Sequence, residues 1–487
     1  TIFIPQLLIL PTVQGIKMRK SIETGRYSLS EHLVIIENNS KTWAYNSLFG
    51  GLRELSDKEI DVLIKLRENN YCYMKSDKET LAKLLADKFV YDSEYDEYLN
   101  LQLIKEKYKI SILNGDSITK LLLNVTSDCN LRCQYCYLNN VEEICGHIEK
   151  KNMTWSTAKK AIDAFYNIIQ KGDNKKVHVR FHGGEPLIQY KLIRQCIEYI
   201  NNKSENVEVR YHMNTNGVLM NQEMAEFFAN QNMNIEVSID AQKEIHDNLR
   251  PFASGKGSFD EGTNAIRLLL ENKMPEENLN IATTLTENNV AHLKEIVDLC
   301  LSLGLKNLEI NTLLFRSKFD VIDIEKRVNA LIDVRSYGLR KGVRVTGKWF
   351  KLIERLKDTV LNYCGRFGQQ ISVDSDEGVY VCTGYLHKYT QLDTIDDLFK
   401  DEEYFAVAMR GIGNIEGCKD CMIEGACAGG CTAAVIAENG TFDVPEYKEC
   451  EFRKLMAKKL IENMDRIICE EINFEEIDKT YVPIVNN

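Results

Sequence analysis

The chain of 487 residues is 44% hydrophobic and has a formal net charge of −11. This length predicts two or three domains with a large core, and the acidic balance disfavours nucleic acid and anionic membrane as partners, because both need a basic face. No apolar run is long enough to span a bilayer, and the stretch "IFIPQLLIL" has its basic residues after it, the reverse of a signal peptide. We therefore expect a soluble, cytoplasmic protein.

The first predicted unit lies within residues 1–112. The runs "HLVIIEN" and "TWAYNSLF" predict two strands, joined by the turn residues "NNSK". Ser56 and Glu59 have the spacing of a capping box and predict that a helix begins there, and "KETLAKLLADKFV" predicts a second helix. A hairpin followed by helices indicates a winged-helix-like module. The alternative is an ordinary N-terminal extension packed on the core.

Residues 119–345 alternate between strand-like and helical patterns. The predicted strands are "KLLLNVT", "KVHVRFH", "VEVRYHMN", "NIEVSID", "NLNIATTL" and "NLEINTLLF". The predicted helices are 156–170, 187–201, 221–230, 258–272 and 291–303. Such β–α units predict an α/β fold with a parallel sheet and helices outside, either open or curled into a partial (β/α)6 barrel. Ligands in such folds bind at the carboxyl ends of the strands.

Fifteen cysteines are many for a cytosolic chain, and clustered thiols there indicate metal binding or catalysis more than disulfides. Ten of them fall within 129–136 and 364–450. For the five scattered cysteines we expect buried, unreactive packing. These are Cys72, Cys145, Cys196, Cys300 and Cys469.

The first cysteine group is the segment "SDCNLRCQYCYLNN", in which Cys129, Cys133 and Cys136 follow the first predicted strand directly. Thiolates suit zinc, copper(I) and iron–sulfur clusters. A structural zinc site closes with a fourth ligand, for which His147 is the nearest candidate. Three cysteines leave one iron of a 4Fe–4S cluster open for another ligand, and the spacing favours iron–sulfur over zinc.

The pattern C-x3-C-x-aromatic-C after the first strand of a β/α array resembles the radical S-adenosylmethionine (SAM) superfamily, and "HGGEP" at the end of the second strand is similar to its GGEP motif. The resemblance implies that Gly183, Gly184 and Glu185 hold the amino group of SAM. Glycines permit close approach of the backbone, and a carboxylate suits an ammonium group.

Two later strand ends carry further motifs of this family, "NTNG" and "VSIDA", and "HDNLRPFASGKGSF" follows as it does in many members. The resemblance implies that Ser238 and Asp240 lie near the ribose of SAM and that Arg250 pairs with its carboxylate. Tyr135 matches the aromatic residue beside the adenine, with a core aromatic as the alternative. The implied chemistry is reductive cleavage of SAM to methionine and a 5′-deoxyadenosyl radical. The electron would come from a donor such as flavodoxin or ferredoxin.

The second cysteine region has little regular periodicity and needs metal or disulfide staples to fold. Its core reads C-x2-C-x5-C-x3-C and resembles the SPASM domain, which carries two auxiliary iron–sulfur clusters, whereas a zinc ribbon is the alternative. The resemblance assigns Cys418, Cys421, Cys427 and Cys450 to the second auxiliary cluster and Cys364, Cys382 and Cys431 to the first. This domain is predicted to span 346–455, and a helical tail 456–487.

The first auxiliary cluster departs from the full pattern, because no cysteine occurs between Cys300 and Cys364. We expect three cysteines there with either an open iron or an oxygen ligand, for which Asp358 is the nearest candidate. An open iron would be able to bind a substrate thiolate or to accept an electron.

These features predict a radical SAM enzyme that resembles maturases of ribosomally made peptides and binds the leader of its precursor through the N-terminal module. The open iron favours a thioether cross-link, and carbon–carbon or carbon–oxygen cross-linking and epimerisation stay open. A sulfatase-type maturase, which forms formylglycine, is the runner-up. That branch carries an Asp after the cysteine matching Cys382, where this chain has Thr383. A non-enzymatic electron carrier would need neither the GGEP motif nor the polar strand ends. The sequence identifies no proton acceptor.

Overall fold

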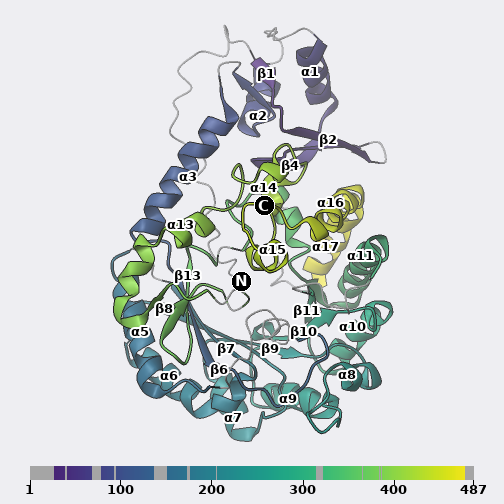
Figure 1. Cartoon of the computed structure of the whole chain (residues 1–487). Coiled ribbons are helices and arrows are strands. Elements are labelled where there is room, and N and C mark those ends of the chain that lie inside the picture. The colour runs from purple at the N-terminus through teal and green to yellow at the C-terminus, as the bar shows by residue number, and fades with distance from the viewer. Residues whose placement is uncertain are drawn as a thin grey trace.

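The computed structural model describes residues 27–38, 41–68, 78–92, 95–136, 151–172, 176–203, 206–313, 322–364, 366–382, 384 and 387–477. The N-terminal module lies at one end of the molecule and the large β/α unit at the other, with the cysteine-rich C-terminal segment between them (Figure 1). Across these described ranges, no helix combines the length and apolarity that crossing a membrane requires.

The N-terminal module contains the predicted hairpin and both predicted helices. Its elements are β1 (Tyr27–Leu29), β2 (Leu33–Asn38), β3 (Lys41–Asn46), β4 (Gly50–Leu55), α1 (Asp57–Glu68), α2 (Lys78–Ala86) and β5 (Val90–Asp92). Strands β2, β3 and β4 form an antiparallel sheet, and β1 pairs with β5. The backbone N–H of Ser56 donates to Glu59 Oε2 at 2.8 Å, as the capping-box pattern predicts. The winged-helix likeness stays a prediction.

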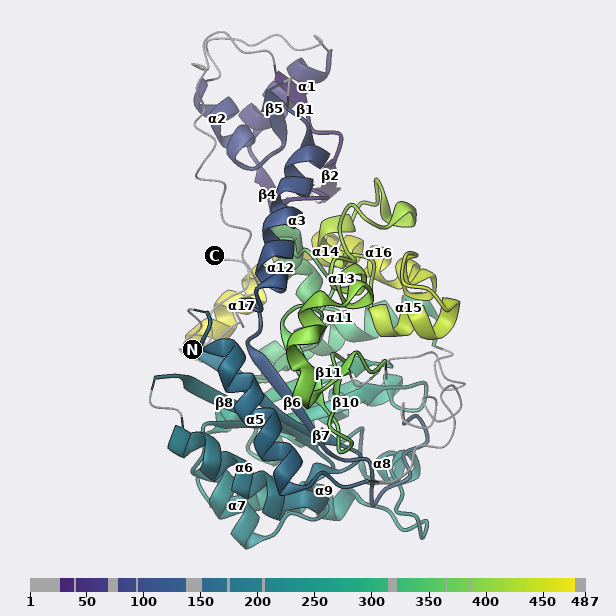
Figure 2. The ribbon, with the colours of Figure 1, turned by 60° about the vertical axis from the view of Figure 1, so that its left-hand side comes forward.

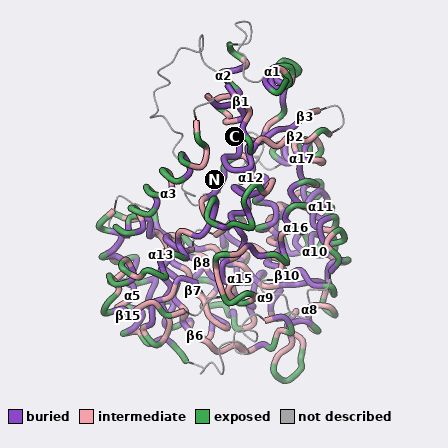
Figure 3. Tube along the Cα trace, turned by 45° about the horizontal axis from the view of Figure 1, so that its top comes forward, coloured by how far each residue is buried: buried purple, intermediate pink, exposed green. Residues whose placement is uncertain are grey.

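A long helix, α3 (Glu97–Leu113), connects this module to the β/α unit (Figure 2). It begins at Asp96, whose side chain accepts a hydrogen bond from the backbone N–H of Leu99. Exposed residues recur along the whole length of α3 (Figure 3), whereas Lys105 and Tyr108 are buried. The helix therefore holds the module on the rest of the molecule through one buried side.

The central sheet has ten strands in the order β12-β11-β10-β9-β8-β7-β6-β13-β14-β15. Its strands are β6 (Lys120–Thr126), β7 (Lys176–Gly183), β8 (Glu208–Thr215), β9 (Met233–Ser238), β10 (Leu279–Leu285), β11 (Asn307–Thr312), β12 (Arg344–Thr346), β13 (Gln370–Val373), β14 (Gly378–Tyr380) and β15 (Thr390–Gln391). The six predicted strands, β6 to β11, are all present and parallel. The sequence did not indicate that β12 and β13 extend this sheet in parallel at its two ends.

Helices follow the strands as the β–α pattern predicts. They are α5 (Trp155–Ile169), α6 (Tyr190–Lys203), α7 (Gln222–Ala229), α8 (Lys243–Leu249), α9 (Phe259–Glu271), α10 (Leu293–Ser302) and α11 (Ile324–Lys341). Short 3-10 turns are η2 (Pro186–Gln189), η3 (Glu276–Asn278) and η4 (Val290–His292). Over the described residues, the sheet order runs from β12 to β15 without closing on itself, so the unit is a partial barrel with an antiparallel extension.

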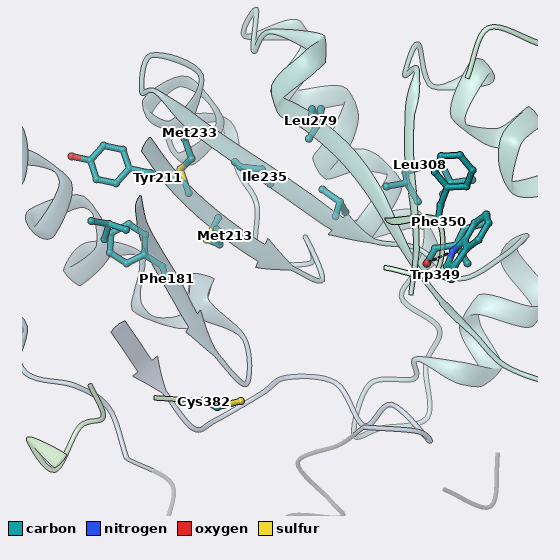
Figure 4. Packing of buried hydrophobic residues seen from close by; sticks show 14 of the residues in the cluster. Phe181, Tyr211, Met213, Met233, Ile235, Leu279, Leu308, Trp349, Phe350 and Cys382 are labelled. Carbon is teal, nitrogen blue, oxygen red and sulfur yellow. Dashed lines mark hydrogen bonds between the residues drawn. The ribbon is translucent and has the colours of Figure 1, made fainter. Parts of the chain in front are cut away.

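The two faces of the sheet differ in polarity. Buried apolar residues such as Phe181, Tyr211 and Ile235 belong to the main hydrophobic core (Figure 4). The residues between them are polar and half-buried, and the register places Arg180 opposite His212. Parallel strands that are buried on both faces read as continuous apolar runs. This sheet therefore has one face packed against helices and one polar face that lines the barrel interior.

The cysteine-rich segment forms more regular structure than its sequence predicts. Its elements, with the tail, are α12 (Lys351–Lys357), η5 (Leu392–Lys400), α13 (Glu402–Ala408), η6 (Glu416–Cys418), α14 (Glu424–Cys427), α15 (Thr432–Asn439), α16 (Tyr447–Glu462) and α17 (Met464–Ile477). Helix α16 packs on α11 through the buried pair Arg327–Glu449, at 2.6 Å. This ion pair joins α16 to the barrel, and α17 follows α16 within the predicted tail 456–487, whose bounds stay a prediction.

Candidate functional site

The cysteine loop after β6 is held between the end of β7 and the end of α8. The backbone N–H of Glu185, after β7, donates to the carbonyl oxygen of Asp128 at 2.8 Å. On the other side, the N–H of Arg132 donates to Pro251 O at 2.7 Å, and that of Gln134 to Leu249 O at 3.0 Å. The loop that carries the three cysteines is therefore fixed by backbone contacts to segments far away in sequence.

The three thiols of this loop are free and half-buried. Burial raises the pKa of Cys129 to about 11 and that of Cys133 to about 12. Over the described residues, no three His, Cys, Asp or Glu side chains lie close enough together to hold one metal ion. The case for iron–sulfur clusters therefore rests on the cysteine pattern and the family, and not on a preformed site for a single ion.

Gly183 and Gly184 lie where no side chain fits. A Cβ on Gly183 would lie 2.4 Å from Thr126 O, and one on Gly184 would lie 2.3 Å from Asp128 O. The N–H of Gly184 donates to Thr126 O at 3.0 Å. Both glycines are therefore required by their close approach to the end of β6 and to the cysteine loop, and their predicted contact with the amino group of SAM stays a prediction.

Glu185 is 1% exposed and accepts three hydrogen bonds. Its donors are Thr215 Oγ1 at 2.6 Å, the N–H of Asn216 at 2.8 Å and the N–H of Leu187 at 2.9 Å. Burial raises the pKa of Glu185 above its usual value, although these donors oppose the shift. The motif thus joins the ends of β7 and β8 and fixes the carboxylate in one orientation.

Asp240, Arg250 and Tyr135 form one buried network. Arg250 Nε donates to Asp240 Oδ2 at 2.7 Å and Nη2 donates to Oδ1 at 3.3 Å, while the Tyr135 hydroxyl donates to Asp240 Oδ2. Burial by itself would raise the pKa of Asp240, but the Arg250 guanidinium lowers it below its usual value. Three of the predicted SAM-contacting residues therefore contact one another, and their predicted contacts with ribose, carboxylate and adenine stay predictions.

Asn216 is a polar residue at this site that the sequence analysis did not assign. Its Nδ2 lies 2.8 Å from Asn130 Oδ1 and 4.0 Å from Cys129 Sγ. It belongs to the "NTNG" motif, so its place at a strand end was the available signal. Ser238, the last residue of β9, is half-buried on the polar face of the sheet.

The seven cysteines of the C-terminal segment separate into two groups in space. In the second auxiliary group, the Cys418 thiol interacts electrostatically with Cys427, Cys421 and Cys450. The N–H of Cys421 donates to Cys418 O at 3.0 Å, and Cys450 comes from the first turn of α16. Burial raises the pKa of Cys418 to about 12. These are the four residues that the resemblance assigns to one cluster, and that assignment stays a prediction.

In the first auxiliary group, the Cys431 thiol interacts electrostatically with Cys382 and Cys364. Arg366 lies beside the same three thiols. Asp358, the candidate oxygen ligand, is exposed at the C-terminal end of α12. Thr383 and His147 lie outside the described residues, as do Cys72 and Cys145. Cys196 and Cys300 are buried as predicted, whereas Cys469 is exposed, so the packing role predicted for it is wrong.

Each of the three cysteine groups has one arginine that donates to a thiol sulfur. The distances from guanidinium nitrogen to Sγ are 3.9 Å each for Arg250 to Cys133, Arg366 to Cys382 and Arg453 to Cys427. A positive donor beside a ligand sulfur stabilises the thiolate and the negative charge of a bound cluster. The sequence analysis did not identify this common feature.

The sequence profile of the radical SAM superfamily matches residues 123–300 of this chain. This range begins in β6 and ends in α10, so it includes the first cysteine group and every strand end described above. The chain belongs to the radical SAM superfamily and is an enzyme.

Three relatives place it more closely. The radical SAM cyclopropyl synthase TigE of Paramaledivibacter caminithermalis is 23% identical over 468 residues, which cover 91% of this chain and 98% of the relative. An uncharacterised protein of Methanocaldococcus jannaschii is 34% identical, covering 55% of this chain and 85% of the relative. The cysteine-type anaerobic sulfatase-maturating enzyme of Clostridium novyi is 27% identical, covering 65% and 88%.

Two solved structures share the fold. Native anSMEcpe with bound AdoMet has a TM-score of 0.60 at 21% identity, covering 72% of this chain and 98% of that chain. Streptococcus suis SuiB bound to precursor peptide SuiA has a TM-score of 0.55 at 16% identity, covering 87% and 100%. The mostly parallel α/β fold predicted from the sequence is therefore confirmed and is shared with these two structures.

The residues present fit the cofactors of the superfamily. The first loop offers three free thiols, and the two glycines next to it admit no side chain. The Nδ2 of Asn130, beside Cys129, is buried without a hydrogen-bond partner among the described residues. Thiolates are soft ligands that suit an iron–sulfur cluster. The closely approaching glycine backbone and the buried amide nitrogen of Asn130 suit a zwitterionic ligand beside it.

Proposed function

We propose that this enzyme is a radical SAM maturase that modifies a ribosomally synthesised precursor peptide, most readily by forming a thioether cross-link. The observation that carries the proposal is the arrangement of ten cysteines in three separate groups, each with its own arginine donor. One group supplies the radical and two remain for electron transfer or substrate binding. A simple electron carrier has no use for the glutamate and glycine contacts around the first group.

We infer that successive segments of the chain have different roles. Residues 1–112 hold the leader of the precursor, 119–345 form the radical SAM core, 346–455 carry two auxiliary clusters and 456–487 form a helical tail. The relation to TigE extends over 91% of this chain, and that to SuiB, solved with a precursor peptide, over 87%. The relation to the sulfatase-maturating enzyme of Clostridium novyi covers 65%. This difference in extent favours peptide maturation over formylglycine formation.

When bound, the cluster and SAM supply a 5′-deoxyadenosyl radical after transfer of one electron from a flavodoxin or ferredoxin. Cys129, Cys133 and Cys136 hold the cluster, and Glu185 binds the ammonium group of SAM within a site whose glycines exclude water by close contact. Ser238, Asp240, Arg250 and Tyr135 define the far wall of this site. Free thiols of this kind persist in a reducing compartment, so we place the enzyme in the cytoplasm.

The first auxiliary group supports the thioether. It contains three cysteines, Cys364, Cys382 and Cys431, so a four-iron cluster there keeps one iron for another ligand. A thiolate of the substrate is a suitable ligand for that iron. A carbon–carbon ring closure is the second candidate, because the relative TigE is a cyclopropyl synthase.

The test uses anaerobically reconstituted enzyme, SAM, dithionite and synthetic peptides translated from short reading frames beside the gene. We expect 5′-deoxyadenosine and a peptide lighter by two hydrogen atoms. Resistance of a cysteine to iodoacetamide would identify the thioether, whereas a free thiol in the lighter peptide would identify carbon–carbon closure. Conversion of cysteine or serine to an aldehyde, or no peptide product at all, would overturn the proposal. A Cys129→Ala variant is the matched inactive control.

A further inference from the structure

The proposed cross-link requires a proton acceptor, and this inference rests on the proposed function. Forming the bond removes two hydrogen atoms from the peptide. One leaves as a hydrogen atom and becomes part of 5′-deoxyadenosine. The other leaves as a proton and an electron, so a basic group must lie near the substrate. None of the SAM-site residues is free for this role, because Glu185 and Asp240 are each held by several donors.

Glu236 lies on the polar inner face of the barrel, in the layer below the SAM site. It is two residues before Ser238 on β9, and alternate residues of a strand share a face. The register places it opposite Asn214 of β8, directly before Thr215, the donor to Glu185. Its carboxylate therefore lies one layer below the predicted ribose contact.

A short relay of hydrogen bonds orients this carboxylate. Asn214 Nδ2 donates to Glu236 Oε2, and Arg180 Nη1 donates to Asn214 Oδ1 at 3.2 Å. Asn214 is thus fixed with its amide nitrogen toward β9. One carboxylate oxygen is held by the relay, which leaves the other for a substrate proton.

A second carboxylate, Glu309 of β11, faces the same interior. Ala282 of β10 pairs with Ser238 of β9 on one side and with Glu309 of β11 on the other. The side chain between Ser238 and Glu309 is therefore only a methyl group. Burial, together with the charge of Glu309, raises the pKa of Glu236 to about 7, although Arg180 and Lys351 oppose the shift. A general base works best when its pKa lies near the pH of the reaction.

We propose that Glu236, with Glu309 as its partner, accepts the substrate proton during cross-linking. Bound SAM would supply the radical that removes a hydrogen atom from a C–H bond of the peptide, and the Glu236 carboxylate takes the proton from the cysteine thiol. The sulfur–carbon bond would then form, with an oxidised auxiliary iron–sulfur cluster as the acceptor of the remaining electron. The two hydrogen atoms lost by the peptide thus leave as one hydrogen atom, one proton and one electron. Glu236 returns its proton to water between turnovers.

Histidines are further candidate bases on this face, and burial lowers the pKa of one of them, His182, to about 3. His178 Nδ1 lies 2.8 Å from His212 Nε2, so the two rings are hydrogen-bonded to each other. Burial lowers the pKa of His178 to about 4, and that of His212 also falls below its usual value. His212 and His178 lie two and four residue pairs further from the carboxyl ends of the strands than Asn214 does. The geometry therefore favours the carboxylate pair over the histidine pair.

The first experiment needs no substrate. Infrared difference spectra of the reconstituted enzyme are recorded as a function of pH for wild type, Glu236→Gln, Glu309→Gln and Glu198→Gln, an exposed control on α6. We expect a protonated carboxyl band in wild type and in the control that titrates near pH 7. Glu424, whose pKa burial also raises to about 7, contributes to this band in every variant, and Glu236→Gln removes the contribution of Glu236. In Glu309→Gln that contribution titrates at lower pH, because a like charge is gone. A wild-type enzyme without a carboxyl titrating in this range overturns the assignment.

The second experiment uses the neighbouring-gene peptides, deuterated at the reacting carbon. For Glu236→Gln we expect deuterium transfer to 5′-deoxyadenosine within about threefold of wild type and cross-linked product reduced by about 100-fold or more. For Glu309→Gln the acid limb of the pH–rate profile moves to lower pH. Unchanged product formation by Glu236→Gln overturns the proton-acceptor role. Failure of wild type to transfer deuterium overturns the proposed function instead, and the infrared titration still decides the state of Glu236.

Discussion

Nε of Arg250 lies 2.7 Å from Oδ2 of Asp240, and both side chains are buried. Asp240 follows β9, and Arg250 ends α8 beside the cysteine loop. The same carboxylate accepts from the hydroxyl of Tyr135, inside the cysteine loop, and from the N–H of Thr284 at 3.0 Å. One carboxylate therefore fixes the cysteine loop to the ends of β9 and β10.

This relationship predicts the effect of Asp240→Asn. The substitution leaves a buried guanidinium without its counter-charge, which costs about 3–5 kcal/mol of folding stability. Urea unfolding of the reconstituted enzyme measures this loss. Because Arg250 lowers the folded-state pKa of Asp240, the stabilisation is present above the unfolded pKa of about 3.9 and is lost as pH falls through the folded-state value. Wild type should therefore lose the contribution only below about pH 4, and a variant as stable as wild type at neutral pH would contradict this.

Glu185→Gln should weaken SAM binding by at least about tenfold, or about 1.4 kcal/mol. The variant loses the charge that pairs with the ammonium group, and its amide nitrogen meets donors where the carboxylate had acceptors. Isothermal titration of SAM into the reconstituted enzyme measures the affinity. Glu198→Gln, on the outside of α6, is the control and should bind as wild type does. Equal affinity in the two variants would exclude Glu185 as the ammonium partner.

Gly184→Ala should displace the cysteine loop that follows β6. We expect this to prevent assembly of the cluster held by Cys129, Cys133 and Cys136 and to leave the two auxiliary clusters intact. Its Cβ would lie 2.3 Å from Asp128 O and 3.0 Å from the Cβ of Cys129, and backbone atoms cannot yield cheaply. If three clusters are present, we expect iron and sulfide to fall by roughly a third, together with loss of 5′-deoxyadenosine formation. Ser254→Ala, in an exposed loop, is the control. Full iron content in Gly184→Ala would show that the loop tolerates the methyl group.

Arg366→Met should lower the reduction potential of the first auxiliary cluster. Arg366 Nη1 donates to Cys382 Sγ at 3.9 Å, and removing a positive donor makes the reduced, more negative cluster less stable. We expect a shift on the order of 60 mV, a tenfold change for a one-electron couple. Potentiometric titration followed by electron paramagnetic resonance measures it. Arg267→Met, on the exposed side of α9, should leave every potential unchanged, and an identical potential in Arg366→Met would refute the role of this donor.

Much of the fold was predictable from local patterns. Strands β6 to β11 and their helices follow from alternating apolar runs and amphipathic stretches, because each element must bury one face. The cysteine spacing and the motif at Gly183, Gly184 and Glu185 likewise lie within short segments, and the structure places them at one rim. The added strands β12 and β13 were not predictable, because they are short and their pairing depends on partners far away in sequence.

The polar inner face of the barrel was visible in the sequence only as alternation within strands. Burial and the charge of Glu309, on a strand two positions away in the sheet, raise the pKa of Glu236, and both causes depend on which strands become neighbours. The same holds for the arginine donors. Arg250 is 117 residues from Cys133 and Arg453 is 26 residues from Cys427, and no local signal connects these pairs.

The sequence by itself determined the chemistry that this protein is able to hold, because ligand type and spacing are properties of a short loop. It also determined the order of the β–α units, because the spacing of apolar residues along the chain differs between a strand and a helix. Only the tertiary structure decided which charges meet. Desolvation and electrostatic interactions depend on distances through space, so the partners of Asp240, Glu236 and the cluster thiols became identifiable only once the chain was folded.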